Sequence, residues 1–196
     1  RQGLNPEEFL KSIHATTGMA DVMVEAAIAK LRPQTPAPKP VARKTLDLKV
    51  YQTVVDCTVA EEPVARYRKM RDATGCKVWS PADQDEKWGI TETGIYNRAL
   101  MLAHPGYDTT EEQVYSYLRE HGLVDASSAD LLSFGAAPET RDLQLEYPVV
   151  ARDSVAEIAR NRFVLCLSAP HGVRVLRAFY LDRGWHGGCR FLVRKA

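Results

Sequence analysis

The sequence predicts an α+β fold: a helical N-terminal arm, a proline-rich tether, and a mixed domain that ends in a three-stranded antiparallel meander. Three observations lead to this prediction. Prolines cluster between positions 33 and 40, helix signals occupy the middle of the chain, and strand-like alternation dominates its end. Helices in one stretch and strands in another are typical of α+β domains rather than of doubly wound sheets. The 196 residues are enough for one ordinary domain and an appendage.

The tether divides the chain into two unequal parts. Four prolines fall within the eight positions 33–40. Each proline removes an amide donor and fixes φ, so neither a helix nor a central strand is expected there. Such a segment is a stiff, extended spacer of roughly 3.1 Å per residue. We therefore predict a helical docking arm over 1–32, a Pro-rich tether over 33–44 and an α+β domain over 45–196.

The arm carries signals for two short helices. Asn5 is suited to the N-cap of the first helix, and Pro6 is suited to its first helical position. A second helix is predicted over 19–31, where apolar side chains recur at helical spacing. Beyond a stiff tether, such a stripe needs another surface to bury it, either that of its own domain or that of a partner. The candidate partner-binding residues, all apolar, are Phe9, Ile13, Met23, Val24, Ala27, Ile28 and Leu31.

The first half of the domain is expected to be mostly helical. A strand is predicted over 45–56, because apolar residues, Val50 among them, alternate with polar ones. Thr109 and Glu112 have the T-x-x-E spacing of a helix capping box. The other elements expected in this half are helices over 61–74, 91–104 and 109–122 and a short strand over 76–79. On the helix over 91–104, the side chains expected to face inward are Ile95, Ala99, Leu100 and Leu102.

The second half is expected to end in strands. A turn of helix is predicted over 129–134, a strand over 145–151, and a short helix over 153–161 with Asp153 as its N-cap. Strands are then predicted over 162–168, 173–181 and 189–194. Because the loops between them are short, we expect these three strands to form an antiparallel meander.

Charge is distributed unevenly along the chain. From residue 160 to the end, eight basic residues face one acidic residue, whereas the rest of the chain carries a net charge of −6. In a strand, alternate residues share one face, which places Arg190 and Arg194 together. Such a basic surface, with aromatic residues nearby, suits three roles: contact with nucleic acid, contact with an acidic protein surface, or pairing with the protein's own acids alone. The residues of this predicted basic surface are Arg162, Arg174, Arg190, Arg194 and Lys195.

The four cysteines give little support for catalysis. They lie far apart without a C-x-x-C pair, and the histidines lack metal-ligand spacing, so we expect neither a metal nor a cofactor. Cys166 and Cys189 lie in or beside apolar runs, and the sequence does not determine whether they form a disulfide. Cys57 with His104 or His171 would suit a Cys/His hydrolase. Two glutamates follow Cys57, however, and their charge would raise the pKa of its thiol.

The tethered arm favours a non-catalytic structural or assembly subunit of a large complex, such as a virus or phage particle or a nucleoprotein machine. In this interpretation the arm docks on a neighbouring protein subunit. The alternative is a nucleic-acid-binding module that contacts DNA or RNA through its basic C-terminal sheet, and a Cys/His hydrolase is the least supported class. No apolar run reaches the eighteen residues of a membrane-spanning helix. We therefore expect a soluble protein in the cytoplasm or in a particle assembled there.

Overall fold

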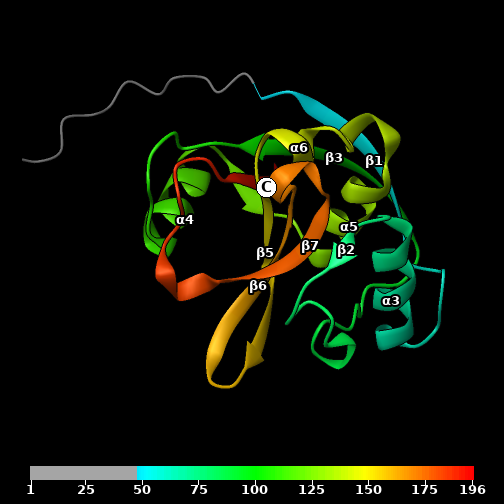
Figure 1. Cartoon of the computed structure of the whole chain (residues 1–196). Coiled ribbons are helices and arrows are strands. Elements are labelled where there is room, and N and C mark those ends of the chain that lie inside the picture. The colour runs from blue at the N-terminus through cyan, green and yellow to red at the C-terminus, as the bar shows by residue number, and fades with distance from the viewer. Residues whose placement is uncertain (1–47) are drawn as a thin grey trace, which may run out of the picture. The chain divides into compact units, whose positions relative to one another are not determined.

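The computed structural model describes residues 48–196, and the predicted arm and tether lie outside them. Their core is an eight-stranded mixed sheet in the order β1-β3-β8-β5-β6-β7-β2, with β4 paired to β8 (Figure 1). The strands are β1 (Val50–Asp56), β2 (Lys77–Val78), β3 (Ile95–Ala103), β4 (Leu123–Asp125), β5 (Val149–Ile158), β6 (Asn161–Ser168), β7 (Val175–Tyr180) and β8 (Arg190–Lys195). The helices are α3 (Pro63–Ala73), α4 (Glu111–Glu120), α5 (Ser128–Ala136) and α6 (Leu143–Glu146), with 3₁₀ turns at Asp85–Lys87, Pro138–Thr140, Pro170–Gly172 and Leu181–Arg183. The α+β class is confirmed for this part of the chain.

The two faces of the sheet bury two separate apolar clusters, because successive side chains of a strand point to opposite faces. In β8, Leu192 belongs to one cluster and Val193 to the other. The first cluster includes side chains of α3 and α5, and the second includes Val114 and Leu118 of α4. Figure 1 accordingly shows α3 and α5 on one side of the sheet and α4 on the other. The central strands are thus covered on both faces.

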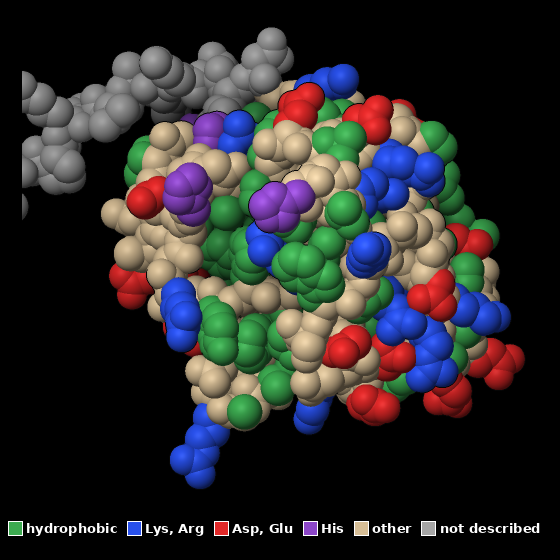
Figure 2. All heavy atoms as spheres, in the orientation of Figure 1, with side chains coloured by type: hydrophobic (Ala, Val, Ile, Leu, Met, Phe, Trp, Pro, Cys, Tyr) green, Lys and Arg blue, Asp and Glu red, His purple; other side chains and the backbone are tan. Residues whose placement is uncertain are grey.

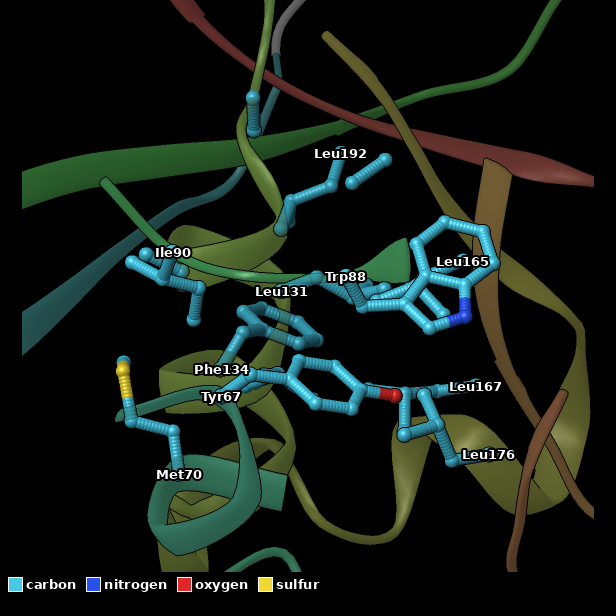
Figure 3. Packing of buried hydrophobic residues seen from close by; sticks show 14 of the residues in the cluster. Tyr67, Met70, Trp88, Ile90, Leu131, Phe134, Leu165, Leu167, Leu176 and Leu192 are labelled. Atoms are coloured by element: carbon cyan, nitrogen blue, oxygen red, sulfur yellow. The ribbon is translucent and has the colours of Figure 1, made fainter. Parts of the chain in front are cut away.

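The cluster beneath α3 and α5 is rich in aromatic side chains. Figure 3 shows the rings of Tyr67, Phe134 and Trp88 gathered against leucines of the sheet. Buried aromatic hydroxyl and indole groups need hydrogen-bond partners. The Tyr67 hydroxyl donates to the Ala82 carbonyl at 2.6 Å, which meets that need within the core. A Cβ atom on Gly135 would lie 2.7 Å from Leu167, so α5 can approach β6 this closely only with glycine there.

The predicted C-terminal meander is wrong. β6 and β7 do form an antiparallel pair, but β8 lies between β3 and β5, so β5 and β6 separate it from β7. The connecting segment crosses to the end of the sheet near α4 instead of making a hairpin. There Trp185 and Thr109 exchange two backbone hydrogen bonds, of 2.7 and 2.9 Å. The buried Trp185 ring packs edge-on against Phe191, which holds the crossover in place.

Two predicted helices are strands in the structure. The helix expected over 91–104 is β3, which pairs along seven residues with β1. The helix expected over 153–161 is the second half of β5 and its turn into β6. Ala159 and Arg160 have φ values of 50° and 65°, which is the conformation of a two-residue hairpin turn. Neither residue is glycine or asparagine, so the sequence carries no signal for this turn. Pairing with β6 overrides the local helix propensity of the strand that precedes it.

The other elements follow the sequence more closely. α3 starts at Pro63, within the predicted helix over 61–74, and α4 has the expected capping box one residue later, on Thr110 and Gln113. α5 extends the turn of helix predicted over 129–134. Within residues 48–196, no helix is long and apolar enough to cross a membrane.

The central position of β8 yields a stability prediction. Leu192 is fully buried, so Leu192→Ala should lower the free energy of unfolding by about 2–5 kcal/mol through lost transfer energy and a cavity. Leu145→Ala on α6 makes the same truncation at a side chain that is 49% exposed and should cost far less, within about 1 kcal/mol. Urea unfolding of both variants measures the difference. Equal losses would contradict the assignment of β8 to the core.

Candidate functional site

The outer face of the β1–β3 pair is the most unusual surface of the described domain. Val50, Val54 and Ile95 are 46%, 61% and 63% exposed, although they are large and apolar. Antiparallel register places Val54 opposite Asn97 and Gln52 opposite Ala99, so all of these side chains point to one face. We call this surface the β1–β3 outer face, and its exposed or half-buried residues are Val50, Gln52, Val54, Asp56, Ile95, Asn97 and Ala99, with Asp56 directly opposite Ile95.

Of these seven side chains, only Asp56 at the end of β1 carries a formal charge, in a chain of which 26% of residues are charged. The opposite side of the same two strands is well covered. Val55 and Leu100 are fully buried there, and Tyr51 packs edge-on against Phe134 of α5 with ring centroids 5.5 Å apart. The sheet therefore has one packed face at this end and one apolar face without a covering layer among the described residues. Several large apolar side chains exposed on one strand face, here between polar ones, are found at many interaction sites.

The free edge of the sheet, which β1 forms, is also open to contact with another protein. Within residues 48–196, β1 pairs with β3 and with no other strand, so its second edge presents unpaired backbone groups. Soluble proteins commonly protect such edges with inward-pointing charges, prolines or bulges. β1 has seven residues in unbroken register with β3, and its charged residues are confined to its ends: Asp56 is its last residue and Lys49 immediately precedes its first. The strand is therefore well suited to contact another protein segment.

The sequence did not identify this surface. Val50 was placed among the alternating apolar positions of the first strand, which implied an inward side chain. Ile95 and Ala99 were expected on the inner side of a helix, but the structure places both on the exposed face of a strand. The available signal was the β-branched residues of β1 at alternating positions 50 and 54, which could equally belong to a core face.

The predicted basic residues do not form one surface. Arg162 donates to Glu111 and Asp182, so acidic groups of the same chain neutralise it. Arg174 donates to the Gly135 carbonyl at 2.6 Å and also contacts Gln144, so it joins α5 to α6. These two arginines have structural partners.

Arg190 and Arg194 share a strand face, as predicted, but Leu192 between them is fully buried in the core, so this is not an open basic face. The Arg190 guanidinium stacks 4.4 Å from the Tyr147 ring, and Arg194 lines a groove beside α4. Lys195 is exposed at the end of β8. On the face of the molecule in Figure 2, basic and acidic side chains alternate over much of the surface.

A different basic and aromatic site lies around the segment between β7 and β8. A cavity of about 410 Å³ is lined by Arg177, Arg183, Phe179 and Trp185, among others. Arg177 stacks 4.4 Å from the Phe179 ring, and Arg183 stacks 4.3 Å from Tyr180. Both arginines were counted in the basic C-terminal segment, but the sequence did not single them out because their aromatic partners depend on the tertiary structure.

The cysteines show no arrangement for catalysis. All four thiols are unbonded, including those of Cys166 and Cys189. Burial is the main cause that raises the pKa of Cys57, with Glu92 adding to it, and burial raises the pKa of Cys166 to about 12. His104 instead bonds through Nε2 to the Gly187 carbonyl at 2.6 Å. Within the described part of the chain, no group of three or more His, Cys, Asp or Glu side chains is placed to hold a metal ion.

Comparison with protein-family models, with curated proteins and with solved structures finds no match to this chain. The candidate sites therefore rest on the geometry of the described residues. Of these sites, the β1–β3 outer face has the largest exposed apolar side chains, and the cavity at Trp185 has the most concentrated basic and aromatic chemistry.

Thiol reactivity tests the assignment of the cysteines. Only Cys76 is partly exposed, whereas Cys57, Cys166 and Cys189 are buried with raised pKa values that favour the neutral thiol. At pH 8 we expect iodoacetamide to modify Cys76 first and the other three only on unfolding, because the thiolate is the nucleophile. Peptide mass spectrometry over time measures the order. Modification of Cys57 as fast as Cys76 would restore the thiol-enzyme interpretation.

Proposed function

We propose that the protein is a non-catalytic assembly subunit, and that the N-terminal arm of one copy docks on the β1–β3 outer face of a neighbouring copy. The observation that carries the proposal is this face, with Val54 and Ile95 more than 60% exposed beside a sheet edge that is unpaired within residues 48–196. A lone domain gains nothing from exposing such a surface, and natural sheets protect their edges against association.

The arm has the chemistry that this face requires. The helix predicted over 19–31 has an apolar stripe that includes Met23, Ile28 and Leu31. An amphipathic helix is stabilised when its apolar side packs on another apolar surface, which is a common mode of recognition between proteins. Because the one charged side chain of the face, Asp56, stands at the end of β1, burial of the other side chains has no ionic desolvation cost.

The tether favours a neighbouring copy over the arm's own domain. At roughly 3.1 Å per residue, the twelve positions 33–44 span about 37 Å as a stiff extended spacer. β1 has seven residues and is about 23 Å long at roughly 3.3 Å per residue. A stiff spacer of this length would give the arm the reach to contact the face of a neighbouring copy. Repeated exchange of arms between copies would link many subunits.

Deletion of residues 1–44 tests the proposal. The truncated domain should keep its melting temperature within a few degrees, because its two apolar clusters are formed by residues of the domain itself. We expect the full chain to sediment as a species several times heavier than 21.9 kDa and the truncated chain to sediment as a monomer. A truncated chain that still dimerises would indicate edge pairing between β1 strands, and a monomeric full chain would contradict assembly altogether.

A point variant separates the face from the rest of the domain. Val54→Asp in the full chain places a charge in the centre of the β1–β3 outer face and should abolish association without unfolding the protein. The matched control is Val155→Asp on β5, which is also an exposed valine on a strand but lies outside this face. Equal association of the two variants would show that another surface holds the assembly together.

A second candidate function is nucleic-acid binding at the Trp185 cavity. The favouring observation is the pair of guanidinium–aromatic stacks formed by Arg177 with Phe179 and Arg183 with Tyr180. Proteins that bind single strands combine positive charge with aromatic rings on which bases stack. In this candidate, the binding residues lie on β7 and in the segment between β7 and β8, and not on the sheet face predicted from the sequence.

Salt dependence tests this candidate. If Arg177 and Arg183 contact phosphates, the affinity for single-stranded DNA or RNA should fall steeply with salt. Each arginine replaced by glutamine should reduce the logarithmic slope by roughly 0.7. Arg160→Gln on the exposed β5–β6 turn is the control and should leave the slope unchanged. Fluorescence anisotropy at low salt with no binding of either nucleic acid would exclude the candidate.

A further inference from the structure

A groove of about 1000 Å³ lies between α4, β4, β5 and β8, away from both sites described above. Its wall is largely apolar, with Leu118 of α4 and Val155 of β5 among its side chains. At its base lies Arg152 of β5, whose side chain is fully buried. A buried arginine in an apolar groove is rare, because an arginine is seldom fully buried unless it is paired.

Arg152 has no hydrogen-bond partner among the described residues. Its Nε, Nη1 and Nη2 atoms are all buried and unsatisfied. The nearest carboxylate oxygen is Oδ1 of Asp125, 3.7 Å from Nη1, which is too long for a hydrogen bond. That oxygen is itself buried without a partner in the described structure. Leaving a buried charge unsatisfied costs free energy, so each such group calls for an explanation.

Another buried arginine of the same domain has hydrogen-bond acceptors for its guanidinium. Arg66 donates to three backbone carbonyl oxygens, those of Ala60, Glu61 and Ile90, at 3.0, 2.8 and 2.6 Å. The domain can therefore supply hydrogen-bond acceptors to a buried guanidinium whose role is only structural. Arg152 lacks such acceptors within residues 48–196, although its position in β5 is just as interior.

An irregularity of β5 sets the position of Arg152. Val150 pairs with Cys166 and Val155 with Val164, so β5 uses more residues than β6 over this span. Bulges of this kind change the direction of a side chain and are frequent beside binding sites. The Tyr115 ring of α4 covers the Arg152 guanidinium at 4.3 Å. Stacking occupies the flat face of the guanidinium and leaves its N–H donors at the edge.

The charges of the groove limit what can bind there. Three arginines and three acids line it, so its formal charge is balanced. Burial is the main cause that raises the pKa of Asp125, with Asp153 and Glu111 adding to it and Arg152 opposing it. A multiply charged phosphate would be repelled by the acids, whereas a single negative charge can bind to Arg152. A carboxylate also matches the forked donors of a guanidinium with two acceptor oxygens.

We propose that this groove is a binding site for an amphipathic monocarboxylate, whose carboxylate accepts hydrogen bonds from Arg152 and whose apolar tail lies along Leu118 and Val155. The carboxylate can be that of a small molecule or of a peptide C-terminus, since both present the same group. The site is independent of the proposed assembly through the β1–β3 outer face.

Isothermal titration calorimetry with octanoate as the probe tests the proposal on the full chain. We expect saturable binding of octanoate at millimolar concentrations or below, and at least tenfold weaker binding of octan-1-ol and of inorganic phosphate. A peptide that ends in a free leucine carboxylate, compared with its C-terminal amide, distinguishes a peptide source from a small molecule. These comparisons use the unmodified protein and so do not depend on the folding of any variant.

Variants then assign the binding to Arg152. Arg152→Met keeps the length and the apolar stem and should weaken octanoate binding about ten- to a hundredfold, the value of one or two charge-assisted hydrogen bonds. Arg152→Lys keeps the charge without the fork and should bind with intermediate affinity. Arg183→Gln removes a positive charge from the Trp185 cavity and should bind like the unmodified protein. No saturable octanoate binding, equal binding of octanol, or binding unchanged by Arg152→Met would each overturn the proposal.

Discussion

The backbone pairing of β8 with β3, β4 and β5 is the interaction on which the rest of the described structure depends. β3 and β4 precede β8 by many residues, and only β8 brings the β1–β3 pair next to β5. Such long-range pairing has a large loop-closure cost, which the burial of Leu192 and Val193 on opposite faces offsets. Without β8, the sheet would divide into the β1–β3 pair and the sheet of β5, β6, β7 and β2.

This arrangement also explains why one face is left without a cover. α4 packs its apolar side over the central strands, where Val114 and Leu118 meet side chains of β3, β5, β6 and β8. β1 lies at the edge of the sheet, and the described helices on that side do not include side chains of β1 in their cluster. The β1–β3 outer face is thus a consequence of a sheet that is wider than its helical layer. Its exposed valine and isoleucine side chains are what make it a candidate site for assembly.

Part of this structure could be predicted from the sequence, and the limit has a physical cause. Local signals were sufficient for α3, which starts at a proline, and for α4, which starts at a capping box. They were insufficient for β3 and for the second half of β5, because residues that favour helices are held in strands by pairing with distant segments. The basic residues were found by counting charge, but their ion pairs and stacking depend on the tertiary structure. Arg152 carried no sequence signal at all, since burial and missing acceptors are visible only in three dimensions.

The central claim is that the arm of one copy contacts the β1–β3 outer face of another. Cross-linking of an equimolar mixture of ¹⁴N- and ¹⁵N-labelled full chains tests it most directly, with Lys30 in the predicted arm helix and the exposed Lys49 beside β1 as reactive groups. The account predicts Lys30–Lys49 linked peptides that carry one light and one heavy partner. Linked peptides of a single isotope only would show that the arm packs on its own domain, and the account would be wrong.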